Sequence, residues 1–300
     1  MAEMDMKAFA EWMRSDLVDS QAPGFIDTLP EKLRQRSLML KSVPNARQLG
    51  GYTVKDGRKI RKGVLLRTAA LGAMSQEEAK KLRDTYRLRL VLDLRSSFER
   101  ALFPDAEVEG AENISESLND EQAMKDMPRP RLPEGGDMRL MSIAMASNPR
   151  ARERMPGIYR DMLLSDHIRG TLADCFHRML ALEGGTVLWH CAQGKDRCGM
   201  LSVLLLGALG AEDPLILDDF DESNTYYAPF IAKRLEFAKG LGCDEETLLA
   251  YRGMLGVERA YMANAVEYMK SEYGSIEGFV KDGLGIGAQG IEELRRFYLE

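Results

Sequence analysis

The sequence predicts an α/β fold in which a central, mostly parallel sheet is flanked by helices. Two short apolar runs, RLVLDLR (residues 89–95) and TVLWH (residues 186–190), have the length and composition of buried strands. Helical patterns lie between and after these runs, and strands that alternate with helices usually form a parallel sheet. The chain has 300 residues, 45% of them hydrophobic and 29% charged, so it can bury one large core. We therefore expect a single domain over residues 1–300.

Helices and turns precede the first buried strand. We expect an N-terminal helical extension over residues 1–40, with an entry helix at residues 28–42. Two glycine-bearing turns within residues 50–57 are expected to flank short strands. The sequence SQEE at residues 75–78 is a capping box, which predicts a helix from there to about Tyr86.

Residues 112–157 interrupt this pattern with polar sequence that contains proline and methionine. A stretch of this length without clear periodicity is usually a functional loop, so we expect a helical lid insertion that covers the site. Helical periodicity returns at residues 158–182. A helical C-terminal layer is expected over residues 198–300, with helices at residues 198–210, 213–222, 225–239, 244–253, 257–273 and 288–299.

Charge and cysteine content argue against several classes of protein. The formal net charge of −6 and the pI near 5.4 do not fit a general nucleic-acid binder, which needs a basic surface. Four scattered cysteines are too few for a disulfide framework, so we expect reduced thiols. The N-terminus lacks the basic start and apolar centre of a signal peptide, and the longest apolar run is about half of the ~20 residues that span a bilayer. We expect a cytoplasmic protein without a transmembrane segment, of unknown oligomeric state.

The stretch WHCAQGKDRCGM (residues 189–200) leads from the second buried strand into a long apolar run. Backbone N–H groups at the start of a helix lack intrahelical partners, so such a loop binds anions. Cys191 lies in this positive potential, where a cysteine pKa typically falls to ~3.5–7.5. Arg197 offers a planar fork for two phosphate oxygens. Gly194 can adopt the positive φ that turns N–H groups inward, and Gly199 lets the next helix pack closely.

These parts suit one reaction. The Cys191 thiolate would attack phosphorus while Arg197 and the loop N–H groups hold the phosphate oxygens, and a phosphocysteine intermediate would then be hydrolysed. The alternative is a structural cysteine beside a surface arginine, because two such residues six positions apart also occur by chance. The preceding His190, the glycine at position 194, the flanking strand and the apolar helix favour the enzyme.

The loop resembles the HCxxGKDR[TS]G signature of the atypical bacterial and fungal tyrosine phosphatases. The resemblance extends to NARQLGGYTVKDGRKIRKGVLLRTAAL, VLDLRSSFER, DDFDESN and DGLGIGAQGIEELRRFYL, which are similar to segments that follow in the same order in that family. The match spans most of residues 40–299. It implies a tyrosine-phosphatase-like sheet with a helical lid, and a phosphatase that acts on phosphotyrosine.

The resemblance also implies a role for each loop residue. Cys191 would be the nucleophile, Arg197 the phosphate-binding residue and Asp196 the general acid, while His190 would tune the thiolate through the loop backbone. Lys195 adds a second positive charge, a feature associated with phosphoinositide substrates alongside phosphoproteins. The remaining loop positions expected around the substrate are Ala192, Gln193, Gly194 and Cys198. No metal or organic cofactor is implied.

Two positions leave the chemistry open. Cys198 stands where the family has Thr or Ser, whose hydroxyl assists breakdown of the intermediate, and a thiol is a weak hydrogen-bond donor. We therefore expect slower dephosphorylation of the enzyme. Asp105, in the sequence FPD, mimics the mobile acid of conventional tyrosine phosphatases, although Pro-Asp is also an ordinary turn signal. We favour Asp196 as the acid, because a general acid must reach the leaving oxygen.

Asp93 and Arg95 end a predicted central strand, so they either support the loop by hydrogen bonds or form a structural ion pair. Two other functions compete with the phosphatase. Rhodaneses and arsenate reductases also place a cysteine in an anion-binding loop, but His190 and the opening motif favour a phosphatase. A phosphate-binding pseudophosphatase is the second competitor, and Cys198 is the reason to consider it.

Overall fold

Five strands form one mixed sheet in the computed structural model, which describes residues 24–119 and 137–300. The spatial order is β1-β2-β5-β3-β4, so β5 lies at the centre. Only the β1–β2 pair is antiparallel; the other three pairs are parallel. The strands are β1 (Arg47–Gln48), β2 (Leu65–Thr68), β3 (Leu88–Asp93), β4 (Glu112–Ser115) and β5 (Thr186–His190). The predicted α/β fold with a mostly parallel sheet is confirmed.

The register brings three strand ends to one edge of the sheet. His190, the last residue of β5, lies opposite Thr68 of β2 and Asp93 of β3. The carboxyl ends of parallel strands are the usual site of ligand binding in open α/β sheets. The loop after β5 therefore begins at the edge where such a fold places its chemistry.

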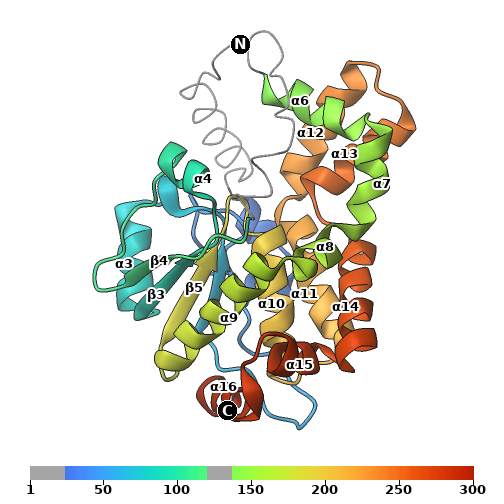
Figure 1. Ribbon diagram of the computed structural model, residues 1–300. Coiled ribbons are helices and arrows are strands. Elements are labelled where there is room, and N and C mark those ends of the chain that lie inside the picture. Colours follow the sequence, from blue (N-terminus) through green and yellow to red (C-terminus); the bar gives the residue numbers. More distant parts are fainter. Residues whose placement is uncertain (1–23, 120–136) are drawn as a thin grey trace.

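Helices cover both faces of the sheet, because alternate strand residues point to opposite faces. Val187 and Trp189 of β5 enter the main apolar core, whereas Leu188 enters a smaller cluster on the opposite face. Figure 1 shows α3 on the side of the smaller cluster and α9 and α10 on the side of the main core. Among the described residues, the helices before β5 are η1 (Phe25–Thr28), α2 (Glu31–Arg34), η2 (Leu71–Ala73), α3 (Gln76–Asp84), α4 (Ser97–Leu102), α6 (Met138–Ala146), α7 (Pro149–Arg154), η3 (Met155–Gly157), α8 (Ile158–Leu164) and α9 (Asp166–Ala181).

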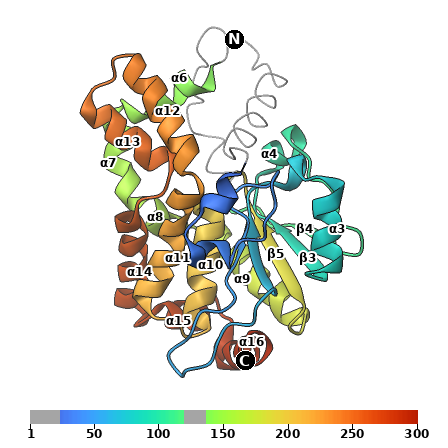
Figure 2. The same cartoon turned by 180° about the vertical axis from the view of Figure 1, so that it is seen from behind.

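The chain after β5 is almost entirely helical. Both views show this layer beside the sheet, with the last helix close to the C-terminus at the bottom (Figures 1 and 2). Its elements are α10 (Asp196–Ala208), α11 (Asp213–Tyr226), α12 (Ala228–Gly240), α13 (Glu245–Leu255), α14 (Arg259–Tyr273), α15 (Ile276–Gly278), the π-helical turn Phe279–Gly283 and α16 (Gly287–Tyr298). None of the helices in the described ranges is long and apolar enough to cross a membrane.

Four helices form a peripheral helical unit, which consists of α6, α7, α12 and α13. Figure 1 shows them together at the upper right, above α8, α11 and α14. They have an apolar cluster of their own, separate from the main core, whose buried members are Ile143, Ala146, Tyr227, Phe230, Ile231, Ala238, Tyr251 and Leu255. Residues 137–157, which belong to the predicted lid insertion, are thus joined to helices that lie after the loop in the sequence.

Two predicted elements differ from the structure. The entry helix over residues 28–42 is wrong, because helical structure there is limited to η1 and α2. The following residues are extended instead: Ser37 bridges Arg47, and the Leu38 N–H donates to Ala46 O. The irregular region also begins later than residue 112, because β4 pairs with β3 at the edge of the sheet. Residues 1–23 and 120–136, parts of the predicted extension and lid, lie outside the described residues.

Candidate active site

The loop between β5 and α10 is built around Gly194. This residue has a φ of 64°, in the left-handed region that favours glycine. A Cβ atom there would lie 2.4 Å from the Thr68 carbonyl oxygen, so no other residue fits without displacing the end of β2. Its N–H lies 3.2 Å from the Cys191 sulfur. The conformation that glycine permits thus directs a backbone donor at the thiol.

Cys191 lies at the start of this loop and is only 2% exposed. Burial by itself would raise its pKa. Hydrogen bonds from the thiol and the backbone N–H of Cys198, together with the positive charge of Arg197, outweigh burial and lower the pKa of Cys191 to about 5. The sulfur is therefore a thiolate at neutral pH, which is the nucleophilic form of cysteine.

Arg197 lies in the first turn of α10 and is held by a carboxylate. Its two terminal nitrogens each donate to one oxygen of Glu99 in α4, both at 2.7 Å. Burial would lower the pKa of Arg197, but the hydrogen bonds with Glu99 and the Cys191 thiolate raise it, so the guanidinium stays charged. Burial likewise opposes ionisation of Glu99, yet Arg197 and the backbone N–H of Ser96 lower the pKa of Glu99 to about 2.

The carbonyl oxygens of the loop are fixed from outside. Arg67 of β2 donates to Gly194 O at 2.9 Å and to Lys195 O at 3.3 Å. The Asn45 side chain donates to Gly194 O at 2.9 Å. These hydrogen bonds fix the orientation of the two peptides, and backbone N–H groups at such a helix start are suited to bind an anion.

A buried carboxylate holds Arg67 in turn. Asp219 of α11 accepts from Arg67 at 3.0 Å, and both side chains are almost completely buried. Arg36, Arg47, Tyr52 and Glu222 complete this charge cluster beneath the loop. Burial opposes the charge of Asp219, but the three arginines keep its pKa below the usual value. The cluster therefore holds Arg67 in place, and Arg67 holds the carbonyls of the loop.

Lys195 is placed differently from its predicted role beside the substrate. Its side chain is 4% exposed, and Nζ donates to three consecutive carbonyls at the end of α13: Met254 at 2.5 Å, Leu255 at 3.0 Å and Gly256 at 2.7 Å. Burial lowers the pKa of Lys195, and the nearby negative charges of Asp196 and Cys191 offset this effect only in part. The ammonium group thus donates to main-chain acceptors, and it also lies 3.8 Å from Asp196 Oδ2.

The two candidate acids have different surroundings. Asp196 begins α10, its side chain is 43% exposed, and its Oδ1 accepts a hydrogen bond of 2.6 Å from the Tyr159 hydroxyl. Asp105 is nearly buried and fully engaged, because it accepts from Arg95 at 2.7 Å and from the Leu71 N–H at 2.9 Å. Burial opposes ionisation of Asp105, but His190 and Arg95 lower its pKa, so it remains an anion.

His190, Asp93, Arg95 and Asp105 form a buried quartet behind Cys191. His190 Nε2 lies 3.1 Å from Asp105 Oδ2, and Arg95 donates to both carboxylates. Burial would lower the pKa of His190, but the two aspartates raise it. Three potential metal-donor atoms lie within 4.8 Å of one another here. The Arg95 guanidinium already donates to both carboxylates, and the aspartates favour the protonated form of His190, which offers no lone pair to a metal.

The remaining loop positions surround the thiol. The Ala192 carbonyl accepts from the Ala70 N–H at 3.2 Å, and the Gln193 carbonyl accepts from the Tyr227 hydroxyl at 2.6 Å. The Cys198 thiol is fully buried, and burial raises its pKa well above the usual value, so it is a neutral S–H group. Gly199 makes room for the Phe220 ring, which a Cβ would approach to 2.7 Å. All the predicted loop residues thus lie around Cys191, although Lys195 turns away.

Sequence reasoning missed several residues that hold the site. Glu99 was within the quoted segment VLDLRSSFER, and its capping box with Ser96 was the available signal. Arg67 and Asp219 also lie in quoted segments without an assigned role. Tyr159 and Tyr227 had no signal, because they contact the loop from distant helices.

Comparisons with known proteins agree with this geometry. The model of the tyrosine phosphatase family matches residues 38–300. A protein of Cupriavidus necator named "putative tyrosine-protein phosphatase" is 27% identical over 88% of this chain and 89% of its own length. The triple specificity protein phosphatase PtpB of Mycobacterium tuberculosis is 33% identical over 40% of this chain and 46% of its own length. A tyrosine-protein phosphatase of Nostoc commune is 32% identical over 43% of this chain and 44% of its own length. The chain therefore belongs to the tyrosine phosphatase family, and it is a phosphatase.

Proposed function

We propose that the protein hydrolyses phosphate monoesters through a covalent phosphocysteine intermediate. One arrangement carries this proposal: a cysteine with a pKa of about 5 lies in an anion-binding loop that ends at a fixed, charged Arg197. Inward N–H groups, a thiolate and a guanidinium are the groups that transfer of a phosphoryl group to sulfur requires. The scheme uses only side chains and backbone of this chain.

In the first step the Cys191 thiolate attacks phosphorus, and a P–S bond forms as the P–O bond to the leaving group breaks. Arg197 and the loop N–H groups stabilise the charge that develops on the three phosphate oxygens. Asp196 transfers its proton to the leaving oxygen, which departs as a neutral alcohol or phenol. Glu99 keeps the guanidinium plane fixed, so little reorganisation is needed as the reaction proceeds.

In the second step water attacks phosphorus and the P–S bond breaks. The Asp196 carboxylate takes a proton from the water, inorganic phosphate is released, and the Cys191 thiolate is restored. The Cys198 thiol donates a hydrogen bond to the departing sulfur. A hydroxyl would donate more strongly, so this step is expected to be the slower one in this chain.

The choice of Asp196 as the acid rests on what surrounds each candidate. A general acid must be able to carry a proton and reach the leaving oxygen. Asp196 is in the loop itself and partly exposed. Asp105 has its carboxylate oxygens bound by Arg95, His190 and a backbone N–H, and its pKa is lowered. We therefore assign Asp105 to support of His190, together with Asp93 and Arg95.

The proposed substrate is a phosphotyrosyl protein, with phosphoserine, phosphothreonine and phosphoinositides as further candidates. The relative from Mycobacterium tuberculosis is named a triple specificity protein phosphatase, which is a statement about that protein. The expectation of phosphoinositide hydrolysis depended on the Lys195 charge, and this ammonium is bonded to three carbonyls. Phosphotyrosine therefore stands first.

The test compares release of p-nitrophenol from p-nitrophenyl phosphate by the wild type and by Cys191→Ser. We expect the variant to lose on the order of 10³-fold or more of kcat, because no other group replaces the nucleophile. A pre-steady-state burst in the wild type would identify the phosphocysteine. Phosphate binding without Cys191-dependent turnover would reject the proposal in favour of a pseudophosphatase, and turnover only of thiosulfate or arsenate would favour the other thiol enzymes.

A further inference from the structure

We infer that Lys195 is a positioning residue, through which the peripheral helical unit holds the catalytic loop, and that it is not a substrate contact. The inference rests on the proposed function, because it assigns a role within the Cys191 loop. Its starting observation is that Lys195 Nζ donates to the carbonyls of Met254, Leu255 and Gly256. An ammonium group has three N–H donors, so this set of acceptors uses all of them.

The acceptors explain why a lysine can be buried here. The last carbonyls of a helix have no intrahelical partners, and the C-terminal end of the helix dipole favours a cation. Lys195 therefore supplies hydrogen-bond donors to the last carbonyls of α13, and these carbonyls stabilise a charge that burial disfavours. Loss of the Lys195 ammonium would leave the three carbonyls without donors, and loss of the carbonyls would leave the buried charge of Lys195 without acceptors.

A second contact links the same unit to the same loop. Tyr227, which joins α11 to α12 and is buried in the cluster of the peripheral unit, donates its hydroxyl to Gln193 O at 2.6 Å. Gln193 and Lys195 flank Gly194, the residue whose N–H faces the Cys191 sulfur. The unit thus holds the loop on both sides of its most constrained position.

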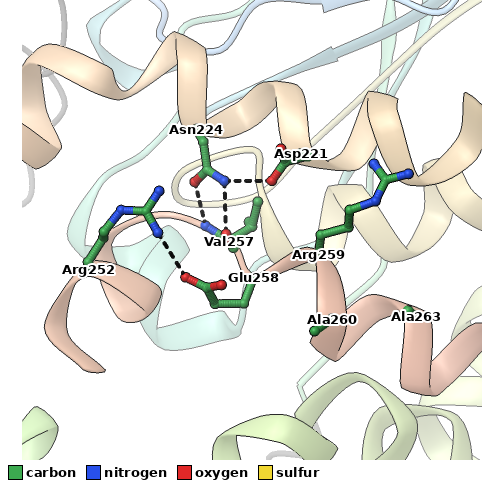
Figure 3. A pocket seen from close by; sticks show the side chains of 8 residues that line it. All are labelled: Asp221, Asn224, Arg252, Val257, Glu258, Arg259, Ala260 and Ala263. Atoms are coloured by element: carbon green, nitrogen blue, oxygen red, sulfur yellow. Dashed lines mark hydrogen bonds and ion pairs between the residues drawn. The ribbon is translucent and has the colours of Figure 1, made fainter. Parts of the chain in front are cut away.

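The end of α13 is itself fixed from the opposite side. The Asn224 side chain of α11 accepts from the Val257 N–H and donates to Val257 O, both at 2.9 Å (Figure 3). At Gly256 a Cβ would lie 2.2 Å from Asn224 Oδ1, so the backbone packs directly against this amide. The hollow drawn in Figure 3 is lined by Asn224 and Val257 but by no residue of the Cys191 loop, and Asn224 is not among the residues proposed to touch the substrate.

This arrangement predicts the same kinetic defect when either Lys195 or Asn224 is replaced. Lys195→Met removes the donor, and Asn224→Ala releases the segment that carries the acceptors while Lys195 stays in place. Both displace the loop, and displacement of about 1 Å at a reacting centre can reduce the rate ~10²-fold. Lys239→Met, an exposed lysine of α12, is the matched control for loss of one positive charge.

The experiment measures kcat and KM for p-nitrophenyl phosphate and for a short-chain phosphatidylinositol phosphate. We expect kcat to fall at least ~10-fold in Lys195→Met and in Asn224→Ala for both substrates, with the ratio of the two KM values unchanged. Lys239→Met should match the wild type. A KM increase confined to the phosphoinositide in Lys195→Met, with Asn224→Ala normal, would overturn the inference and make Lys195 a substrate contact.

A second readout does not depend on turnover. The rate of Cys191 alkylation by iodoacetamide, followed against pH, reports the thiolate directly. If the unit positions the loop, Asn224→Ala should move the midpoint upward from about 5, because the donors to Cys191 are displaced. An unchanged midpoint together with unchanged kcat in Asn224→Ala rejects the inference, even if Lys195→Met does not fold. Absence of Cys191-dependent turnover in the wild type rejects only the proposed function.

Discussion

Glu99 and Arg197 form a two-pronged ion pair in which each carboxylate oxygen accepts one N–H at 2.7 Å. The pair joins α4, which follows β3, to the first turn of α10, which follows β5. Parallel hydrogen bonds of this kind fix the plane of the guanidinium as well as its position. Arg197 is therefore oriented before any anion enters the loop.

Replacement of Glu99 by Gln should impair catalysis although Glu99 is not proposed to touch the substrate. Gln offers one acceptor oxygen in place of two, so the guanidinium loses its fixed plane. We expect kcat/KM for p-nitrophenyl phosphate to fall ~10-fold to 100-fold. Steady-state kinetics measure this, with Glu109→Gln, whose carboxylate is exposed, as the matched control. Equal kcat/KM in the wild type and Glu99→Gln would contradict the role given to this pair.

The Cys191 thiolate should set the acidic limb of activity. Because the pKa of Cys191 is lowered to about 5, the thiolate fraction falls as the pH drops through 5 and is nearly complete at pH 7. Alkylation of Cys191 by iodoacetamide should follow the same curve, and it is measured on the Cys191 peptide because the partly exposed Cys243 is also a free thiol. Cys198 should not react in this range, because burial raises its pKa. A midpoint near 9, the ordinary value for a thiol, would refute this account.

Two variants distinguish Asp196 from Asp105 as the general acid. Asp196→Asn should lower kcat for phenyl phosphate by ~10²-fold to 10⁴-fold, and less for p-nitrophenyl phosphate, whose leaving group needs little protonation. Asp105→Asn should instead reduce thermal stability, because Arg95 and His190 lose a partner. A larger fall of kcat for phenyl phosphate in Asp105→Asn than in Asp196→Asn would reverse the assignment.

Cys198→Ser should accelerate breakdown of the phosphocysteine. A hydroxyl is a better donor to the departing sulfur than a thiol, and it can turn to that sulfur from the Thr68 and Trp189 carbonyls, each 3.8 Å from the Cys198 sulfur, to which the thiol donates in the resting loop. We expect a several-fold larger steady-state kcat and a smaller burst relative to turnover. Rapid-quench measurement of p-nitrophenol release tests this. The idea fails if burst amplitude and turnover are the same in the variant and the wild type.

Gly194→Ala should destabilise the fold and inactivate the loop. The substitution combines a positive φ with a Cβ that would lie 2.4 Å from Thr68 O. We expect the free energy of unfolding to fall by about 1–3 kcal/mol, measured by urea denaturation. Gly170→Ala in α9 is the control, because a Cβ there meets no atom within 4 Å. In a helix interior that change should stabilise by up to about 1 kcal/mol. Equal effects of the two variants would contradict the packing argument.

Local signals account for what the sequence predicted well. The run TVLWH coincides with β5, because a fully buried central strand is apolar along its whole length. The capping box at Ser75 and Glu78 forms as expected and starts α3. The entry helix failed because residues after Gln35 satisfy their backbone groups by bridging the segment around Arg47. Ser37 pairs with Arg47 in this bridge, and such a pairing leaves no helical or strand pattern in the residues before it.

The same distinction between local and non-local signals applies to the candidate site. Cys191, Arg197 and Gly194 could be predicted because the loop carries its own motif. The direction of Lys195 could not, because its partners are main-chain carbonyls about sixty residues later in the chain. Carbonyl groups are the same in every residue, so they leave no signature in the sequence. Tyr159 was hidden for a similar reason, since one aromatic residue in a helix usually indicates core packing.

The separate apolar cluster of the peripheral helical unit has a thermodynamic consequence. A unit with its own small core can open without unfolding the sheet, so its amides should exchange with solvent at a lower free-energy cost than those of β5. The unit contacts Gln193 and Lys195, so opening of the unit weakens anion binding in the loop, and anion binding disfavours opening to the same extent. A saturating anion that binds only the ordered loop should therefore slow amide exchange in the last turn of α13. The factor of slowing should equal the factor by which closure of the unit raises the affinity for the anion.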